Sequence, residues 1–431
     1  MVLALDTNLR KLLAVLASVA ASALLALPVW SHLHADHFSR QGTQVALRKA
    51  IDFEPANAEL RNRLGRVLLY SPLGDTKQAL HELDRATRMD PRTAAFWLDL
   101  ALAHELEGNW TAAAGAFQAA RAAEPRTPAV LWRLANFELR RGENERALAA
   151  LRDLLAQAPE YTGRALPVFA RVAGLETLLD RAVPFRSDAL AAALDYVRIE
   201  NDVAGAPLVW QRLLELGEPL QPGQVRYFLD WVLLGGRGRL GARIWRDAAE
   251  RGWIPVSAAD ASALLYNGDF SHPLLNYGLD WHIAPNPDAS VWMEPGGAEP
   301  GQQSLCVRFR EDSRDGYWHV RHWIPVEPGH HYTLNAWLRS ERLLSRRGAY
   351  LQLDESRPDV RISAQTEPVL GNSKWTEVMI RFAPGPQTEL INLSLIRAPS
   401  GPGGPPASGM VCLAGVSWKD LGAPLARSAT K

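Results

Sequence analysis

The chain has 431 residues, equal numbers of basic and acidic residues (47 Lys and Arg, 47 Asp and Glu) and 47% hydrophobic residues. This balance excludes a disordered, collagen-like or polytopic membrane chain, and the zero net charge argues against a nucleic-acid partner. Only two cysteines, Cys306 and Cys412, are present, which excludes a disulfide-rich scaffold and a zinc site built from cysteines alone.

The first predicted element is a membrane helix. Residues 12–30 carry no charge and follow Arg10 and Lys11. A helix of this length spans a bilayer core of about 30 Å, whereas the apolar part of a cleavable signal peptide has about 7–15 residues. We therefore expect residues 1–35 to be a cytoplasmic stub and an uncleaved single-pass anchor in the inner (cytoplasmic) membrane, with the bulk of the chain in the periplasm. A long signal peptide cleaved after Ala35 is the alternative.

His32, His34, Asp36 and His37 follow the apolar run and are residue types that bind zinc or copper. A metal site needs converging ligands and neighbours that orient the imidazoles, which a flexible segment next to the membrane does not provide. We interpret these residues as solvated polar groups at the lipid boundary and expect no metal there.

Prolines mark a repeat in the next segment. Pro55, Pro91, Pro125 and Pro159 are spaced 36, 34 and 34 residues apart, and each closes an Ala/Leu-rich helical pattern. A leucine and then a small residue return nine and ten positions after each of the first three prolines. This pattern resembles the tetratricopeptide repeat family, whose repeat is a helical hairpin of 34 residues.

The resemblance implies a helical solenoid. We expect tetratricopeptide repeats over residues 36–160, starting with a partial repeat whose second helix covers residues 46–55. Ala-rich amphipathic segments predict degenerate helical repeats over residues 161–262, because such arrays tolerate drift in sequence.

The family binds peptides on a concave face lined by the first helix of each repeat, which implies a protein partner for this chain. The positions that carry over as a protein-binding groove are Asn62, Arg66, Tyr70, Leu98, Leu102, Glu105, Trp132, Asn136 and Arg140. Trp132 is expected to be an anchor in the groove, because it lies one position past the expected packing aromatic. The alternative is that a local shift of frame makes Trp132 that packing aromatic.

Composition changes near residue 266, after which 16 of the 29 prolines and 7 of the 15 tryptophans occur. Short alternating segments separated by turn residues predict an antiparallel β-sandwich over residues 263–422, followed by a disordered tail at 423–431. The predicted strands lie at residues 304–309, 317–326, 332–340, 349–355, 375–382, 389–396 and 409–418. The fold class is thus multidomain α plus β.

Three stretches of this region resemble jelly-roll carbohydrate-binding modules with a galactose-binding-like fold: residues 267–281, which would form the entry strand, residues 324–340 and residues 409–421. The resemblance implies adjacent first and last long strands, and a disulfide between Cys306 and Cys412 in an exported domain. The resemblance also allows a structural calcium ion, but the residues of this chain give it little support. Ala414 and Gly415 stand where relatives carry acidic residues, and Asp269 alone cannot supply the six to eight oxygens that calcium needs.

Strand alternation predicts a glycan-binding face on the sandwich, if the strands concerned are neighbours. A tryptophan among amides and charges suits the apolar face and hydroxyl rim of a sugar ring. The outward residues are Asn335, Trp337, Arg339, Tyr350, Gln352, Asp354, Asn392 and Ser394. The facing of His319, Arg321 and Trp323 is left open. The alternative is an ordinary polar face, with Trp337 covered by a loop or by helices.

No catalytic motif is recognisable, so we expect a binding protein with no cofactor and not an enzyme. The leading hypothesis is a membrane-anchored scaffold in bacterial envelope or exopolysaccharide assembly, whose repeats bind a protein and whose sandwich binds or abuts a glycan. That setting follows from the two resemblances combined. The alternative is a pure protein-interaction adaptor with a structural, non-binding sandwich.

Overall fold

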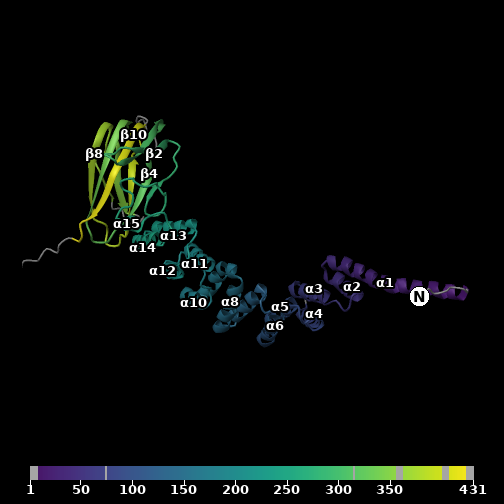
Figure 1. The fold of residues 1–431 in the computed structure, drawn as a ribbon. Helices are drawn as coiled ribbons and strands as arrows, with labels where there is room; N and C mark the ends of the chain where they lie inside the picture. The colour runs from purple at the N-terminus through teal and green to yellow at the C-terminus, as the bar shows by residue number, and fades with distance from the viewer. Residues whose placement is uncertain (1–7, 73–74, 314–315, 356–362, 400–406, 424–431) are drawn as a thin grey trace, which may run out of the picture. The chain divides into compact units, whose positions relative to one another are not determined.

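The computed structural model describes residues 8–72, 75–313, 316–355, 363–399 and 407–423. The chain divides into two compact units, Met1–Pro184 and Phe185–Lys431. The first consists of helices, and the second combines helices with a β-sandwich, so the predicted fold class is confirmed (Figure 1). The predicted disordered tail lies outside the described residues, apart from its first residue.

Helical hairpins build the first unit. Its elements are α1 (Asn8–Arg40), α2 (Gln44–Phe53), α3 (Ala58–Tyr70), α4 (Thr76–Met89), α5 (Ala94–Leu106), α6 (Trp110–Ala123), α7 (Pro128–Arg140), α8 (Asn144–Gln157), the 3-10 helix η1 (Pro159–Tyr161), α9 (Thr162–Ala173) and α10 (Leu175–Arg181). The pairs α3–α4, α5–α6 and α7–α8 are the three repeats predicted from the proline spacing.

Small residues let the two helices of each pair approach closely. A methyl group on Gly65 of α3 would lie 2.6 Å from the Leu83 side chain of α4, so glycine is required there. The equivalent residues of the next repeats, Ala101 and Ala135, are fully buried. The hairpin turns contain Gly108 and Gly142 at positive φ, a conformation that glycine adopts without steric cost.

Two different side chains occupy the family's aromatic position and make the same hydrogen bond. Trp97 Nε1 donates to the Pro91 carbonyl at 2.9 Å, and Arg61 donates through Nε and Nη2 to the Pro55 carbonyl at 3.3 and 3.1 Å. Arginine therefore replaces tryptophan without leaving the carbonyl of the repeat-closing proline unsatisfied.

Helix α1 does not end at the apolar run but continues to Arg40. Its last part packs on α2 and α3, where Ala35 joins a buried cluster with Leu47 and Leu64. This part supplies the first helix of the partial repeat, whose second helix is α2. The expectation of a flexible segment around His32–His37 is therefore wrong, because these residues lie within the helix.

The second unit starts with α11 (Ser187–Ile199), α12 (Gly205–Leu216), α13 (Pro222–Leu234), α14 (Gly238–Glu250) and α15 (Ala258–Ala261). The strands that follow are β1 (Trp281–Ile283), β2 (Ala289–Pro295), β3 (Gln303–Ser313), β4 (Tyr317–Pro325), β5 (Tyr332–Leu344), β6 (Ala349–Glu355), β7 (Ser363–Gln365), β8 (Gly371–Phe382), β9 (Leu390–Arg397) and β10 (Ala407–Asp420).

The strands form two antiparallel sheets, ordered β1-β4-β9-β6-β7 and β2-β3-β10-β5-β8. One buried cluster joins their inner faces and contains Leu334, Leu351 and Leu393, as strand alternation predicts. The seven predicted strands are present, whereas β1, β2 and β7 were not predicted. The predicted entry strand is wrong at its start, because Asn267–Phe270 form a turn with Asn267 at a φ of 54°.

Helices α13 and α14 pack on one end of the sandwich within the second unit (Figure 1). Asp230 of α13 accepts a hydrogen bond from the Gly278 N–H at 2.9 Å. Gly238 of α14 lies so close to the strand region that an added methyl group would sit 1.7 Å from the Glu389 carbonyl oxygen. The division between the units at Pro184 therefore falls well before the change in composition near residue 266.

Candidate binding sites on the repeats and the sandwich

The structure separates the nine predicted groove residues by exposure. Asn62 and Leu98 are buried, at 3% and 5% exposed, and are not accessible to a ligand. The exposed ones are Arg66, Tyr70 and Arg140, and the half-buried ones are Leu102, Glu105, Trp132 and Asn136. Two of the three exposed groove residues are arginines, so basic side chains dominate the part of the groove that a ligand can reach.

Asp99 of α5 organises charges from three successive repeats. Its carboxylate accepts a hydrogen bond from Asn62 Nδ2 at 2.9 Å, and it lies 3.8 Å from Arg66 Nε and 3.7 Å from Arg133 Nη1. The Asp99 side chain is 11% exposed, whereas the two arginine side chains are about half exposed, at 56% and 49%. The acidic partner is thus covered, and each guanidinium keeps donors directed at solvent.

A second covered acid holds a third arginine. Glu105 of α5, with its side chain 10% exposed, accepts from Arg140 Nε at 2.5 Å and from Arg140 Nη2 at 2.9 Å. Such bidentate pairs fix the orientation of the guanidinium. We call Arg66, Arg133 and Arg140, with Asp99 and Glu105, the arginine row.

Sequence reasoning missed Asp99 and Arg133, although a signal was present. Both lie eight residues after the proline that closes the preceding repeat, and Arg63 occupies the same position in the first repeat. A charged residue that returns at one repeat position indicates a shared surface more directly than positions carried over from a family.

Trp132 is neither a free anchor nor the core aromatic. Leu131 is fully buried in the packing position, while Trp132 lies beside Tyr161 and Phe169 at centroid distances of 5.9 and 6.3 Å. The guanidinium of Arg164 lies 4.8 Å from the Trp132 ring centroid. Trp132 thus packs α7 against the start of α9 through aromatic and cation–π contacts.

The predicted glycan platform is split between the two sheets. Asn335, Trp337 and Arg339 lie on β5, whereas β6 and β9 belong to the other sheet. The assumed strand neighbourhood is therefore wrong for β5. Strands β6 and β9 are neighbours, and they bring the remaining residues together, namely Tyr350, Gln352, Asp354, Asn392 and Ser394.

Strand β4 completes this second set. His319, Arg321 and Trp323 alternate with the buried Val320, His322 and Ile324, so they face outward. Register aligns Trp323 with Asn392 and Asn392 with Asp354, and a second line joins Arg321, Ser394 and Gln352. We call these six residues with Tyr350 the amide face, although Ser394 is buried, at 2% exposed, and is not accessible to a ligand.

Hydrogen bonds within the amide face orient its polar groups. Gln352 Nε2 donates to both Asp354 carboxylate oxygens at 2.8 and 2.9 Å, and Asn392 Nδ2 donates to Ser394 Oγ at 2.8 Å. Asn392 Oδ1 is buried and has no hydrogen-bond partner among the residues that the structure describes. Because this oxygen is buried, it is not accessible to a ligand, and the polar side chains that remain exposed or half-buried on the amide face include Arg321, Gln352 and Asp354.

His282 of β1 lies against the aromatic end of the amide face, with its ring centroid 4.3 Å from that of Trp323. Burial lowers the pKa of His282, which keeps the imidazole neutral at pH 7. Burial also raises the pKa of Asp230, which faces His282 from α13. The surroundings of Trp323 and His282 therefore include a residue of α13, Asp230, as well as residues of the sandwich.

The outward face of the other sheet carries Trp337 together with two tryptophans that sequence reasoning missed, Trp292 and Trp375. Cys306 and Cys412 form a disulfide that links directly opposed residues of β3 and β10. Trp292 and Trp375 pack on the disulfide, and the guanidinium of Arg339 lies 5.2 Å from the Trp375 centroid. Their signal was the alternation within residues 290–294 and 375–382, which places both rings outward.

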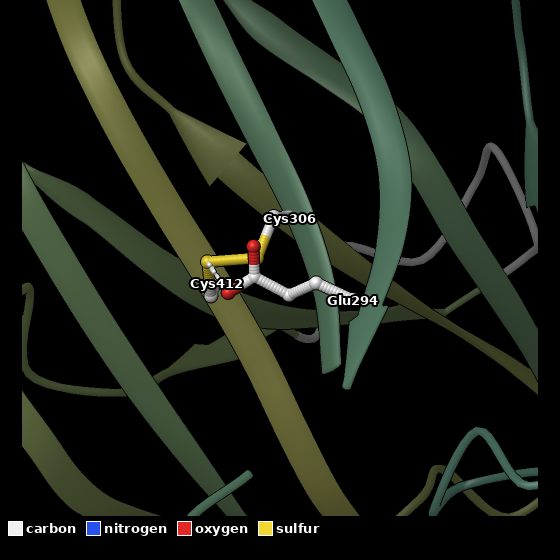
Figure 2. Close-up of side chains that lie close together, drawn as sticks. All are labelled: Glu294, Cys306 and Cys412. Atoms are coloured by element: carbon white, nitrogen blue, oxygen red, sulfur yellow. Dashed lines mark hydrogen bonds between the residues drawn. A yellow bond between two sulfur atoms is a disulfide. The ribbon is translucent and has the colours of Figure 1, made fainter. Parts of the chain in front are cut away.

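Figure 2 shows the Glu294 carboxylate lying over this disulfide. Glu294, Cys306 and Cys412 bring three metal-ligand atoms within 4.8 Å of one another. The two sulfurs are bonded to each other, and Arg339 Nη2 donates to Glu294 Oε1 at 2.6 Å. The arrangement is a half-buried ion pair on a disulfide and does not suit a cation.

Backbone contacts join the turn Asn267–Phe270 to β10, near Ala414 and Gly415. The Val416 N–H donates to the Gly268 carbonyl at 2.8 Å, and a methyl group on Gly268 would lie 2.1 Å from the Val416 carbonyl oxygen. The Asp269 carboxylate accepts from the N–H and the hydroxyl of Ser271. The turn Asn267–Phe270 thus packs directly on β10.

The geometry of the repeats can be compared with known proteins. A family model described as tetratricopeptide repeat matches residues 64–125 and 107–162. This segment consists of tetratricopeptide repeats. Such hairpins are protein-interaction scaffolds, which agrees with the exposed arginine row. No curated protein sequence matches the chain.

Several solved structures resemble parts of the chain. A crystal structure of MamA protein is 20% identical, covers 41% of this chain and 95% of its own, and gives a TM-score of 0.32. PilW, described as a widely conserved type IV pilus biogenesis factor, is 15% identical, with coverages of 44% and 77% and a TM-score of 0.28. A structure described as "CBM4 structure and function" is 14% identical, with coverages of 36% and 99% and a TM-score of 0.27. These likenesses transfer no function to the chain.

Proposed function

We propose that the protein is a membrane-anchored, extracytoplasmic scaffold whose repeats bind a peptide segment of a partner and whose sandwich binds a glycan. The glycan part rests on one observation: a tryptophan, an amide and a carboxylate, namely Trp323, Asn392 and Asp354, stand in register on the neighbouring strands β4, β9 and β6. Sugars need a ring for their apolar face and planar groups for their hydroxyls, and the amide face provides both.

The glycan proposal is tested by binding of the full chain, in detergent, to an array of bacterial envelope and storage polysaccharides. Trp323→Ala is expected to weaken retention at least tenfold, as for loss of a stacking anchor. Trp337→Ala is the matched control, because Trp337 is an outward tryptophan of the opposite sheet. Loss of binding in Trp337→Ala alone would move the site to that sheet. Absence of binding by the wild-type protein, or unchanged binding by both variants, would contradict the proposed glycan site.

For the repeats, the half-exposed guanidinium groups of the arginine row favour a partner segment rich in carboxylates and backbone carbonyls. Fluorescence anisotropy with acidic, neutral and basic peptides tests this choice. Arg133→Met is expected to weaken binding of acidic peptides severalfold. Arg126→Met, which changes an exposed arginine in a repeat turn, serves as the control and is expected to have no effect.

The membrane part of the proposal is supported by α1, the single helix of the described residues that is long and apolar enough to cross a bilayer. Side chains of its apolar run, such as Leu16 and Leu25, are exposed, as lipid contact requires. Arg10 and Lys11 before the run favour a cytoplasmic N-terminus and a periplasmic body. Envelope or exopolysaccharide assembly is the setting that combines an anchor, a peptide-binding array and a glycan-binding lobe.

The alternative function is an adaptor whose sandwich only stabilises the helical array. One observation favours it: α13 and α14 pack tightly on the sandwich through Gly238 and Asp230. Under this alternative, neither tryptophan variant changes retention on any polysaccharide, while Arg133→Met still weakens peptide binding.

A further inference from the structure

Helix α1 runs without a break from the apolar run into the packed helices of the repeat array. Its apolar run extends to Trp30, and the same helix continues to Arg40 as part of the repeat array. Ser39 and Ala35 are buried at 5% and 2% exposed, and Arg63 Nη2 of α3 donates to the Ser39 carbonyl at 2.8 Å. The structure thus has no linker between the apolar run and the first packed residues of the array.

Helix α2 then returns to the level where the apolar run ends. Ser31–Arg40 rises roughly 15 Å at 1.5 Å per residue, and α2 runs back over a similar length. The ring of Phe53 at the end of α2 lies 5.4 Å from that of Trp30 and 5.2 Å from that of His34. Ser31 Oγ donates to the Phe53 carbonyl at 2.5 Å.

A side-chain pair holds the turn that follows α2 at the same level. His32 Nδ1 lies 2.7 Å from Glu54 Oε1, and Asn57 Nδ2 donates to Glu54 Oε2 at 2.7 Å. Asn57 also caps α3 by accepting from the Leu60 N–H. The turn Glu54–Asn57 is therefore fixed to His32 through Glu54 and to the start of α3 through Asn57.

From these contacts we infer that the turn Glu54–Asn57 lies in the headgroup layer of the bilayer, and that the hairpin of Ser31–Phe53 stands on the membrane as a rigid continuation of the anchor. The inference rests on the proposed anchor. Tryptophan at the end of the apolar run suits the interface, and Leu12–Trp30 as a helix matches a core of about 30 Å.

The acidic residues of the turn indicate that its contact with the headgroups results from its position beside α1 and does not depend on anionic lipid. The turn itself carries Glu54, and the neighbouring turn residue Asp90 lines the same 710 Å³ pocket as Glu54, Pro55 and Asn57. A hydrogen bond from Asn57 is the main cause that lowers the pKa of Glu54, which keeps the carboxylate ionised. Carboxylates do not attract anionic headgroups, so the turn is held at the surface by its contacts with α1.

The test uses the full chain in phosphatidylcholine liposomes with single cysteines carrying an environment-sensitive fluorophore. Ala56→Cys labels the turn, Gln41→Cys labels the opposite end of the same hairpin, and Ala21→Cys labels the apolar run. All three positions are exposed. Cys306 and Cys412 are paired and fully buried, so they do not react without reductant. Circular dichroism checks that each variant is folded.

Quenching by lipids with a headgroup spin label is expected to be at least threefold stronger at position 56 than at position 41, and unchanged when anionic lipid is added. Lipids labelled in the acyl chain are expected to quench position 21. If position 21 is quenched while positions 56 and 41 behave alike, the anchor stands and the inference about the turn is overturned. If position 21 is not quenched, the anchor itself fails, and the inference fails with it.

Discussion

At the scale of single residues, two glycines differ in whether an added methyl group would clash with a neighbouring element. The Cα of Gly238 faces the Glu389 carbonyl, where a methyl group would sit 1.7 Å from the oxygen. Gly238→Ala must therefore push α14 away from the sandwich, and we expect a loss of at least about 2 kcal/mol in the unfolding free energy of the second unit. Urea unfolding followed by circular dichroism measures this loss.

Gly115→Ala is the matched control for that experiment. Gly115 lies inside α6, and no atom lies within 4 Å of an added methyl group there. Because alanine has the higher helix propensity, this variant is expected to gain up to about 1 kcal/mol. Equal stability of the wild-type protein and Gly238→Ala would contradict the packing of α14 on the strand region.

His322 gives the second residue-scale prediction, a pH dependence. It is 1% exposed, and its Nε2 and Nδ1 each lie 3.0 Å from a carbonyl oxygen, of Tyr266 and Trp323. Burial lowers the pKa of His322 to about 4. Since the unfolded chain has the ordinary value near 6.5, the stability that His322 contributes is fully present above pH 6.5. It is lost as the pH falls toward 4, by roughly 3 kcal/mol at most.

Hydrogen exchange of peptides from β4 at pH 7 and pH 5, corrected for intrinsic rates, measures this loss. His322→Gln cannot titrate and is expected to show a smaller change between the two pH values. Burial raises the pKa of Asp230 and Asp280, so these groups act in the opposite sense, but they are present in both proteins and drop out of the comparison. Identical pH dependence in both proteins would rule out His322 as the titrating group.

At the scale of elements, the disulfide joins β3 to β10 across 106 residues of sequence. Closing so long a loop restricts the unfolded chain, and its loss typically costs 2–5 kcal/mol. The double variant Cys306→Ala, Cys412→Ala keeps the Glu294–Arg339 ion pair and is expected to lose about that much stability in urea unfolding under oxidising conditions. With reductant present, the wild-type protein should approach the variant. A variant as stable as the oxidised wild-type protein would contradict the prediction.

The existence of the elements was predictable because it depends on local pattern. Proline spacing and small residues such as Ala101 predict hairpins, and alternation around Leu334 and Leu351 predicts strands with the correct inward side chains. The order of strands in the sheets was not predictable, because pairing depends on contacts far apart in sequence. One wrong neighbour, β5, therefore placed Trp337 on the same platform as Tyr350.

At the scale of the whole molecule, composition located the change from helix to sandwich but not the extent of the compact units. The reason is visible at Gly278, whose φ is 63° and where an added methyl group would lie 2.7 Å from Leu229 and Trp245. A loop that follows the change in composition thus packs on helices that precede it. Contacts of this kind leave no signal in local sequence patterns, so a boundary drawn from composition does not identify a folding unit.

This organisation predicts that the sandwich alone, residues 263–423, is less stable than residues 185–423. The shorter fragment lacks Asp230, which accepts from the Gly278 N–H, and Arg239, which pairs with Glu327 at 3.0 Å. It also exposes the apolar surface that Trp245 covers. Thermal unfolding by circular dichroism is expected to show a lower midpoint for the shorter fragment, by about 2–4 °C for each kcal/mol lost. Equal midpoints would mean that α13 and α14 rest on the sandwich without stabilising it.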